Sequence, residues 1–589
     1  MPDDTLTRRG DLGEGATTAH EDIEPELILE ELELLAHRRL CRTQFGRGGR
    51  NIEIVLRDGR EKTQLLYLHA PSVKGHPLAS RSRGGHKPVT KHAQMRISRT
   101  TIVRIPGRTL VLPLALALAT LAGCAHVPVV DEADLVKATD GSQIKVYGAR
   151  GPLSARQSKA VLSQLAEQAP DAGALERHLA VEQIVAESPL FTGNQVRILR
   201  DGAETFPAMF AAIRQATHYV YLEYYIFEDV TCDGEMLSDL LIRQSHAGVR
   251  VRVIYDGIGS IGTDSSFFDK LQAAGVQVIE FNPLNPWKRH SALNSRDHRK
   301  LLVADGTVAI IGGVNLSSTY QSAPSAGEGK AIQAGDSPLQ QNVWHDTDVQ
   351  INGPVVPELE KLFKEHWREQ LGVPLEAESN PRAGTSASIA GGTAPNSDSD
   401  SPSQPPGDEV VRILGSSPTK LKRRYYVTVI SAIRNAESSI WITGAYFVPT
   451  HQEKEGLIAA ARRGVDVRLL LPSRSDSGPA LAVQHSHYEE LLRAGVKIYE
   501  RDDGILHSKT MVIDQVWSIV GSSNFDHRSI LFNDEVDAVV LGKETGERLA
   551  DDFKADLKHA QAIDPRLWQH RSALEHLREN FWRLWEQLL

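Results

Sequence analysis

Two short segments of the chain repeat one pattern of histidine, lysine and aspartate at identical spacing. The pattern H-x-K-x4-D occurs in HRKLLVAD at residues 298–305 and again in HSKTMVID at residues 507–514. A histidine can attack phosphorus or transfer a proton, and a lysine can stabilise the negative charge on phosphate oxygens. A single match is weak evidence, because it arises by chance in about one chain in twenty of this composition. Two matches in one chain predict phosphate-ester chemistry, provided that the fold brings them together.

The sequence around the two motifs is duplicated as well. AAIRQATHYVYLEYYIF (211–227) corresponds to SAIRNAESSIWITGAYF (431–447), and LQAAGVQVIE (271–280) corresponds to LLRAGVKIYE (491–500). Corresponding blocks in the same order indicate the tandem duplication of a whole domain. The two motifs are therefore expected to meet across a pseudo-twofold interface, which makes the chain a pseudo-dimer of its own halves.

The elements that position the motifs alternate between helices and strands. Amphipathic stretches such as FPAMFAAIRQA lead into β-branched and aromatic runs such as YVYLEYYIF, and the motif segments LLVAD and TMVID alternate as strands do. This alternation predicts an α/β fold of two tandem homologous domains. Each domain is expected to hold a mixed central sheet flanked by helices, with the active site at the interface. The aromatic run is interpreted first as core strand and second as a substrate wall.

Two histidines that flank one phosphorus atom can divide a difficult displacement into two easier steps. One histidine attacks and forms a phosphohistidine, while the other protonates the leaving oxygen and then deprotonates the incoming alcohol or water. Lysines and asparagine amides stabilise the developing charge. This chemistry requires no metal ion or cofactor, so none is expected.

The paired motifs resemble those of the phospholipase D superfamily, and the resemblance covers about residues 190–589. Flanking segments such as SPLFTGNQVRILRDGAETFPAMFAAI and WHDTDVQINGPVV are most similar to bacterial cardiolipin synthases. The resemblance implies catalytic residues His298, Lys300, Asp305, His507, Lys509 and Asp514, and phosphate-binding residues Asn315, Ser522 and Asn524. It also implies that a carboxylate further downstream holds each histidine by its other ring nitrogen, with Asp346 at this position in the first copy and Glu535 in the second. The motif aspartates are implied to tie the strands in place. Gly313 stands where the second copy has Ser522.

The same resemblance implies transfer of a phosphatidyl group from one phosphatidylglycerol to another, with release of glycerol and with His298 as the nucleophile. Alternatives are hydrolysis of phospholipids by water, a nuclease, and a lipid-binding module without activity. Residues 124–589 hold 47 lysines and arginines against 61 aspartates and glutamates, a balance of −14. Nucleic-acid binders usually carry a basic excess, so no nucleic-acid partner is expected. Two intact motifs argue against a module without activity.

An apolar run at residues 110–123 follows an arginine-rich segment and ends in Leu-Ala-Gly-Cys124. The run is short for a spanning helix, which needs about 20 residues. It resembles the signal of bacterial lipoproteins, which implies a signal peptide at 95–123 and a lipid anchor at Cys124. The residue after the cysteine, Ala125, implies an outer-membrane location that faces the periplasm. A signal-anchor helix retained in the membrane is the alternative. Residues 1–94 are expected to be either an over-extension of the reading frame, with translation starting at Met95, or a disordered segment.

The remaining boundaries follow from composition and from the repeat. We expect a stalk with helical segments at 124–190, the two domains at 191–375 and 409–589, and between them a Ser/Gly/Pro/Asp-rich disordered linker at 376–408. The second domain is expected to end in an amphipathic helix, because apolar residues recur there at helical spacing. These residues are Leu567, Leu574, Leu577, Phe581, Leu584 and Leu588. Packing against the second domain is the favoured interpretation. Membrane contact is the other, supported by Trp568, Trp582 and Trp585.

Overall fold

The computed structural model divides the chain into two units, residues 1–106 and residues 107–589. In the first unit it describes the backbone of two antiparallel strands, β1 (Asn51–Leu56) and β2 (Gln64–His69). In the second unit it describes residues 127, 129–130, 144–186, 188–283, 294–322, 343–371, 407–418 and 423–589. The expected signal peptide, Cys124 and nearly all of the expected linker lie outside the described residues. Among the helices that are described, none has both the length and the apolar character to cross a bilayer.

Two mixed sheets form the body of the second unit, and their strands follow the same order. In the first half the order is β10 (Gln277–Phe281), β9 (Arg250–Asp256), β6 (Tyr219–Tyr224), β12 (Lys300–Ala304), β13 (Val308–Gly312), β15 (Thr347–Asn352) and β5 (Leu190–Arg200). In the second half the order is β19 (Lys497–Arg501), β18 (Asp466–Pro472), β17 (Ser439–Thr443), β21 (Thr510–Ile513), β22 (Trp517–Gly521), β23 (Asn533–Leu541) and β16 (Glu409–Ser416). In each sheet the first three strands run parallel and the other neighbours run antiparallel. This repetition confirms the predicted tandem α/β domains.

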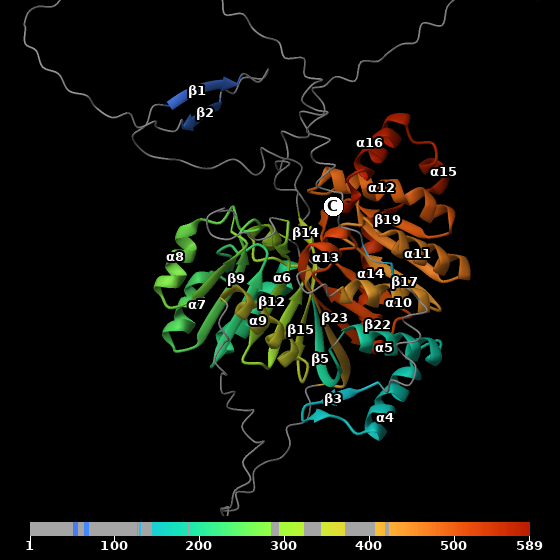
Figure 1. Ribbon diagram of the computed structural model, residues 1–589, viewed down its shortest axis with the longest axis horizontal. Coiled ribbons are helices and arrows are strands. Elements are labelled where there is room, and N and C mark those ends of the chain that lie inside the picture. The colour runs from blue at the N-terminus through green and yellow to red at the C-terminus, as the bar shows by residue number, and fades with distance from the viewer. Residues whose placement is uncertain are drawn as a thin grey trace, which may run out of the picture. The chain divides into compact units, whose positions relative to one another are not determined.

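The two halves lie side by side, with β5, β15, β22 and β23 near the middle of the molecule (Figure 1). β16 pairs with β23 along its length and also with β5, so that one strand links the two sheets. On the outer faces lie α6 (Asp201–Gln215), α7 (Leu237–His246) and α8 (Ser265–Ala273) in the first half, and α10 (Arg424–Asn435), α11 (His451–Arg463) and α12 (Gly478–Arg493) in the second. α9 (Val356–Leu371) contributes to the core between the sheets.

The motif strands are buried on both faces, because each lies between two apolar layers. In β12, Leu302 and Ala304 pack in the outer core of the first half, whereas Leu301 and Val303 pack in a core shared with the second half. Successive side chains of a strand point to opposite faces, so one apolar run serves both layers. The shared core also contains Val536 of β23. Burial of each such side chain contributes roughly 1.5–3 kcal/mol, and this contribution holds the two halves together.

Local sequence signals set the ends of the outer helices. Before α11, the side chain of Thr450 accepts a hydrogen bond from the backbone N–H of Glu453, and the Glu453 carboxylate accepts one from the backbone N–H of Thr450. This capping box satisfies two backbone donors that a helix start leaves unpaired. The helix ends at Gly464, whose φ of 96° suits a residue without a Cβ atom.

Residues 144–186 pack against the two-domain body. β3 (Val146–Gly148) pairs with β4 (Gly151–Pro152) and runs parallel to β5. The helices α4 (Ala155–Ala166) and α5 (Ala172–Ala186) follow. Nδ1 of His178 in α5 lies 3.0 Å from Oγ of Ser431 in α10. This part of the expected stalk therefore belongs to the folded body.

The C-terminal tail corrects one expectation about packing. After α14 (Lys543–Asp556) the tail forms β24 (Ala560–Ala562), α15 (Pro565–Trp568), α16 (Ala573–Arg583) and a 3-10 turn at Glu586–Leu588. α16 lies against α12, as the favoured interpretation expected. Five of the six residues expected to make that contact are exposed to solvent instead, whereas Leu588 is half-buried. Leu567, Leu574, Leu577, Phe581 and Leu584 are 47–76% exposed.

Candidate active site

Each motif is attached to a strand of the opposite half. His298 follows a short strand, β11 (Arg296–Asp297), which pairs in parallel with the start of β23, and its backbone N–H donates to the carbonyl of Asp534 at 2.9 Å. His507 follows β20 (Ile505–Leu506), which pairs in parallel with β14 (Trp344–His345) of the first half. The backbone N–H of His507 donates to the carbonyl of His345 at 2.7 Å. These two strand pairings, each between one half and the other, bring the motifs to the interface.

The same strand pairings place a carboxylate of one half beside the histidine of the other. Nδ1 of His298 lies 3.0 Å from both carboxylate oxygens of Glu535. Nδ1 of His507 lies 2.7 Å from Oδ2 of Asp346. A carboxylate at Nδ1 holds the proton on that nitrogen and leaves Nε2 as the basic atom. Within the described part of the chain, Nε2 of neither histidine has a hydrogen-bond partner, so both imidazoles are set to act on a substrate.

The two motif lysines are buried beside the histidines. Nζ of Lys300 donates to the carbonyl of His298 at 2.6 Å and lies 5.5 Å from the ring centre of Tyr225. Nζ of Lys509 donates to the carbonyl of His507 and lies 2.9 Å from its Nδ1. The site therefore concentrates positive charge, which suits the equatorial oxygens of a phosphodiester.

Burial and this charge cluster shift the ionisation of the site. Burial lowers the pKa of His298 well below its usual range, and Lys300, Lys509 and His507 lower it further. Burial also lowers the pKa of His507, although Asp346 opposes that shift.

Burial also shifts the pKa values of two charged neighbours, in each case toward the neutral form. Burial lowers the pKa of Lys300 to about 7, and burial raises the pKa of Glu535 to about 7. The lowered pKa of His298 thus favours its neutral imidazole, which is the state that a nucleophile requires.

The predicted phosphate-binding residues lie around this cluster in different roles. Oδ1 of Asn315 accepts from the backbone N–H of Ile226, and its Nδ2 donates to the hydroxyl of Tyr320 at 3.0 Å. Oγ of Ser522 donates to Glu535 at 2.5 Å and accepts from the backbone N–H of Val536. Oδ1 of Asn524 is buried and accepts no hydrogen bond from the described residues. Ser522 therefore supports the carboxylate that holds His298.

A side chain at position 313, which corresponds to Ser522, has no space. A Cβ atom added to Gly313 would lie 2.0 Å from Oδ1 of Asp346. Asp346 thus approaches the backbone directly, whereas Glu535 is one carbon longer and is reached by the serine hydroxyl.

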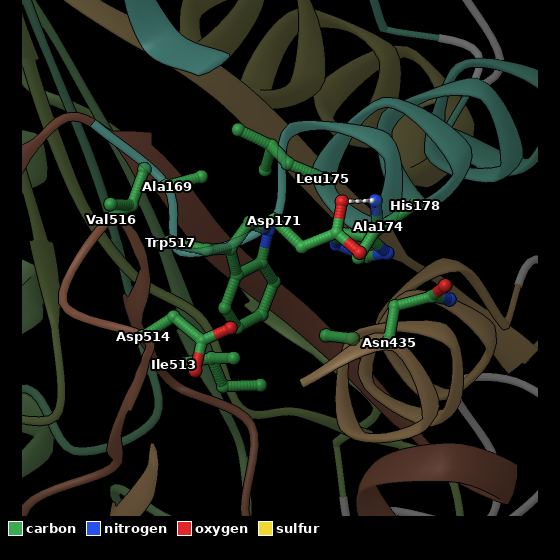
Figure 2. Close-up of a pocket in the computed structure, with 11 residues that line it drawn as sticks. Ala169, Asp171, Ala174, Leu175, His178, Asn435, Ile513, Asp514, Val516 and Trp517 are labelled. Atoms are coloured by element: carbon green, nitrogen blue, oxygen red, sulfur yellow. Dashed lines mark hydrogen bonds between the residues drawn. The ribbon is translucent and has the colours of Figure 1, made fainter. Parts of the chain in front are cut away.

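The motif aspartates directly follow their strands, at the ends away from the histidines, and accept hydrogen bonds from backbone N–H groups. The carboxylate of Asp305 accepts from the backbone N–H groups of Thr217, His218 and Tyr219, at 2.7–2.9 Å, and from the hydroxyl of Thr217. Asp514 accepts in the same way from Glu437, Ser438 and Ser439. Figure 2 presents Asp514 in a pocket that it shares with Asp171, His178 and Trp517 and that contains neither motif histidine. This geometry suits a structural role, as the resemblance implied.

Three residues that contact the histidines or their carboxylates were not predicted as site residues. The hydroxyl of Tyr320 lies 3.2 Å from Nδ1 of His507, and Nδ2 of Asn533 donates to Glu535 at 3.1 Å. The ring of Tyr225 meets that of His298 edge to face at 5.3 Å. Tyr225 follows the buried strand β6, so the aromatic run supplies both core and site wall. No sequence pattern pointed to Tyr320, because it contacts His507 only across the interface between the halves.

One buried cluster beside the site has the composition of a metal site. Ligand atoms of Glu223, Asp297 and His366 lie within 4.8 Å of one another. Nη1 of Arg299 already lies 3.0 Å from Glu223. Although burial opposes its charge, Glu223 and Asp297 raise the pKa of His366 to about 9. A protonated imidazole has no lone pair for a metal. The cluster is therefore an ion-pair network that ties α9 to the first motif.

Comparison with known proteins agrees with this geometry. A family model described as "Cardiolipin synthase, PLD-like domain" matches residues 209–324 and 429–557, one match in each half. Cardiolipin synthase of Alkalihalophilus pseudofirmus is 32% identical over 406 residues, which is 69% of this chain and 74% of that protein. Cardiolipin synthase of Geobacillus thermodenitrificans is 33% identical over 422 residues, which is 70% of this chain and 75% of that protein.

A solved structure shares the fold. The phosphatidylserine synthase of Haemophilus influenzae has a TM-score of 0.50 and 14% identity, and the match covers 70% of this chain and 99% of that one. At this identity the likeness concerns the fold alone. The two curated relatives carry the closer likeness, because each aligns over about three quarters of its length at nearly one identical residue in three. The chain therefore belongs to the cardiolipin synthase family of phospholipase D-like proteins.

Proposed function

We propose that the protein transfers the phosphatidyl group of one phosphatidylglycerol to a second phosphatidylglycerol and releases glycerol. One observation carries the proposal: two imidazoles, each held at Nδ1 by a carboxylate, share one buried site with two lysines. That constellation suits a two-step displacement at phosphorus. The names of the relatives that align over most of their length support a lipid alcohol, rather than water, as the acceptor.

In the first step, Nε2 of His298 attacks the phosphorus of the donor lipid, and the bond from phosphorus to the headgroup glycerol oxygen breaks. His507, doubly protonated once the anionic phosphodiester is bound, gives its Nε2 proton to that oxygen, and glycerol leaves. In the second step, His507 takes the proton from a headgroup hydroxyl of the acceptor lipid. The hydroxyl oxygen attacks phosphorus, the N–P bond breaks, and cardiolipin forms. Lys300 and Lys509 stabilise the phosphate oxygens in both steps.

The proposal is tested by the products. The purified full chain is incubated with vesicles of phosphatidylglycerol, and the lipids and released glycerol are resolved. We expect cardiolipin and glycerol in equal amounts. Phosphatidic acid without cardiolipin would contradict transfer and support hydrolysis, because the same phosphohistidine can be released by water. The His298→Ala variant serves as the control for chemistry at this site.

We further propose that Cys124 carries a lipid anchor and that the protein faces the periplasm, at the outer membrane. The support is the Leu-Ala-Gly-Cys124 sequence that ends the apolar run. Several acyl chains bind a membrane firmly, since each buried CH₂ adds about 0.8 kcal/mol. Cys124→Ser is expected to abolish acylation and to leave an uncleaved precursor. Normal processing of that variant, with unchanged partition into membranes, would replace the lipid anchor with a signal-anchor helix.

A further inference from the structure

The last helix of the chain has its apolar side turned away from the protein. Leu574, Leu577, Phe581 and Leu584 recur at steps of three and four, and therefore share one face of α16 and its C-terminal end. They are 70%, 55%, 47% and 76% exposed, whereas Glu579 is only 7% exposed. An amphipathic helix on a water-soluble surface buries its apolar face. The orientation of α16 is the reverse.

Polar and aromatic contacts hold the tail in this orientation. Nη2 of Arg571 pairs with Glu579 at 2.8 Å, and the Arg571 guanidinium lies 4.0 Å from the ring centre of Trp568. Trp568 in turn packs against Tyr488 of α12, with ring centres 4.9 Å apart. Nε2 of His487, also in α12, lies 3.2 Å from Glu586. The inward side of the tail therefore packs against α12 through polar and aromatic side chains, and the leucines on the outward side take no part in this contact.

The tail ends at the margin of the active site. The carbonyl of Leu589 accepts a hydrogen bond from the backbone N–H of Arg528 at 3.2 Å, and that of Leu588 accepts one from its Nη1 at 3.3 Å. Arg528 is near enough to His298 for its charge to lower the pKa of that histidine, after the larger effect of burial and of the nearer lysines. The tail that carries the apolar face therefore contacts a residue whose charge acts on His298.

We propose that the face formed by Leu574, Leu577, Phe581 and Leu584 docks the protein on a lipid bilayer. The inference rests on the proposed function, because a diacyl lipid is presented to the enzyme in a bilayer and the docking face must border the site. Arg578, which follows Leu577, is exposed and suits an anionic lipid surface. The two exposed carboxylates of the tail are engaged as caps: Asp564 accepts from the backbone of Arg566, and Glu575 from that of Ser572.

The half-buried Trp582 and Trp585 flank the face. Indole rings favour the boundary between water and lipid, so their position supports a bilayer over a second copy of the chain. A bilayer also explains why the exposed residues are leucine and phenylalanine along a single helix face, which is the pattern of interfacial helices.

Hydrogen exchange of the full chain tests the docking face locally, whatever else holds the protein to the membrane. Exchange is followed in peptides covering residues 564–589, with and without vesicles of phosphatidylglycerol and phosphatidylethanolamine. We expect vesicles to slow exchange there at least tenfold, and the double substitution Leu577→Glu with Phe581→Glu to abolish the effect. Leu371→Glu, which alters an apolar residue that is 52% exposed on α9, is the matched control and should leave the protection intact. Both changes are at exposed positions, so folding is checked by thermal unfolding.

The outcomes separate this inference from the proposed function. Equal protection of the tail in the double variant, or no protection in the wild type, would overturn the docking face even if cardiolipin is formed. Protection that grows with protein concentration in the absence of vesicles would overturn it in favour of a second copy. Protection of the wild type without any transfer would leave the docking face standing and remove the proposed reaction. Against monomeric short-chain phosphatidylglycerol, the double variant should keep wild-type activity within about twofold.

Discussion

Nδ1 of His298 lies 3.0 Å from the carboxylate of Glu535, a residue 237 positions later that belongs to the other half of the duplicated fold. The reciprocal contact joins His507 to Asp346 at 2.7 Å. Each half therefore supplies the histidine of one pair and the carboxylate of the other. A single half contains neither pair, so the arrangement exists only after the two halves dock.

Removal of the carboxylate from one pair should impair turnover more than binding. In the Glu535→Gln variant the amide can donate to Nδ1 of His298 and so favour the wrong tautomer. We expect kcat to fall by about 10²–10⁴, the scale found when a histidine loses its orienting carboxylate, with KM changed less than about threefold. Steady-state kinetics on phosphatidylglycerol vesicles measure both constants. Asp346→Asn is the reciprocal variant, and a change confined to KM in either would contradict the orienting role.

The nucleophile can be identified by trapping. With labelled donor lipid and a rapid acid-free quench, we expect the phosphoryl label on the peptide that contains His298. Its low pKa keeps the imidazole neutral and able to attack. His298→Ala should remove the label and lower the rate by several orders of magnitude, because the covalent route is lost. A label on the peptide that contains His507 would reverse the two roles.

The motif aspartates are expected to affect stability rather than chemistry. Asp514→Ala removes the acceptor for three backbone N–H groups and one hydroxyl, at a residue with φ of 54°. We expect a loss of about 1–3 kcal/mol in the free energy of unfolding, measured in urea. Asp514→Asn is the matched control, because asparagine tolerates the left-handed region and keeps one oxygen acceptor. A stable Asp514→Ala variant with abolished turnover would show that the aspartate acts in the reaction.

The buried ammonium group of Lys300 is expected to lower the free energy of unfolding of the protein. Burial lowers its pKa from 10.5 to about 7, so the unfolded chain binds the proton more tightly than the folded protein does. The wild type is therefore expected to lose stability as the pH falls from about 10.5 to 7, and to lose no more below that range. Lys300→Met lacks this loss, and its melting temperature should exceed that of the wild type most at pH 7 and below.

The matched control for that measurement is Lys361→Met, at a lysine side chain that is 60% exposed. Its melting temperature should follow that of the wild type at every pH. The difference between Lys300→Met and the wild type should shrink toward pH 10. A difference that is constant with pH would indicate a packing effect of the methionine instead of the ionisation of Lys300.

The sequence by itself determined the class of fold and the residues of the two motifs. Tandem repetition and strand alternation are local patterns, so they could be recognised without coordinates, and both sheets have the expected mixed arrangement. The backbone contacts of Asp305 were likewise implied by the family pattern, because they are made within one half.

Only the tertiary structure decided which carboxylate serves which histidine, because pairing β11 with β23 and β14 with β20 exchanges the partners between halves. It also decided which side of α16 is buried. Periodicity identifies an apolar face but carries no information about what covers it. The contacts of Trp568 with Tyr488 and of Arg571 with Glu579 hold the polar side inward, and the leucines are left outward. Such choices depend on contacts between residues far apart in the chain, which local patterns do not encode.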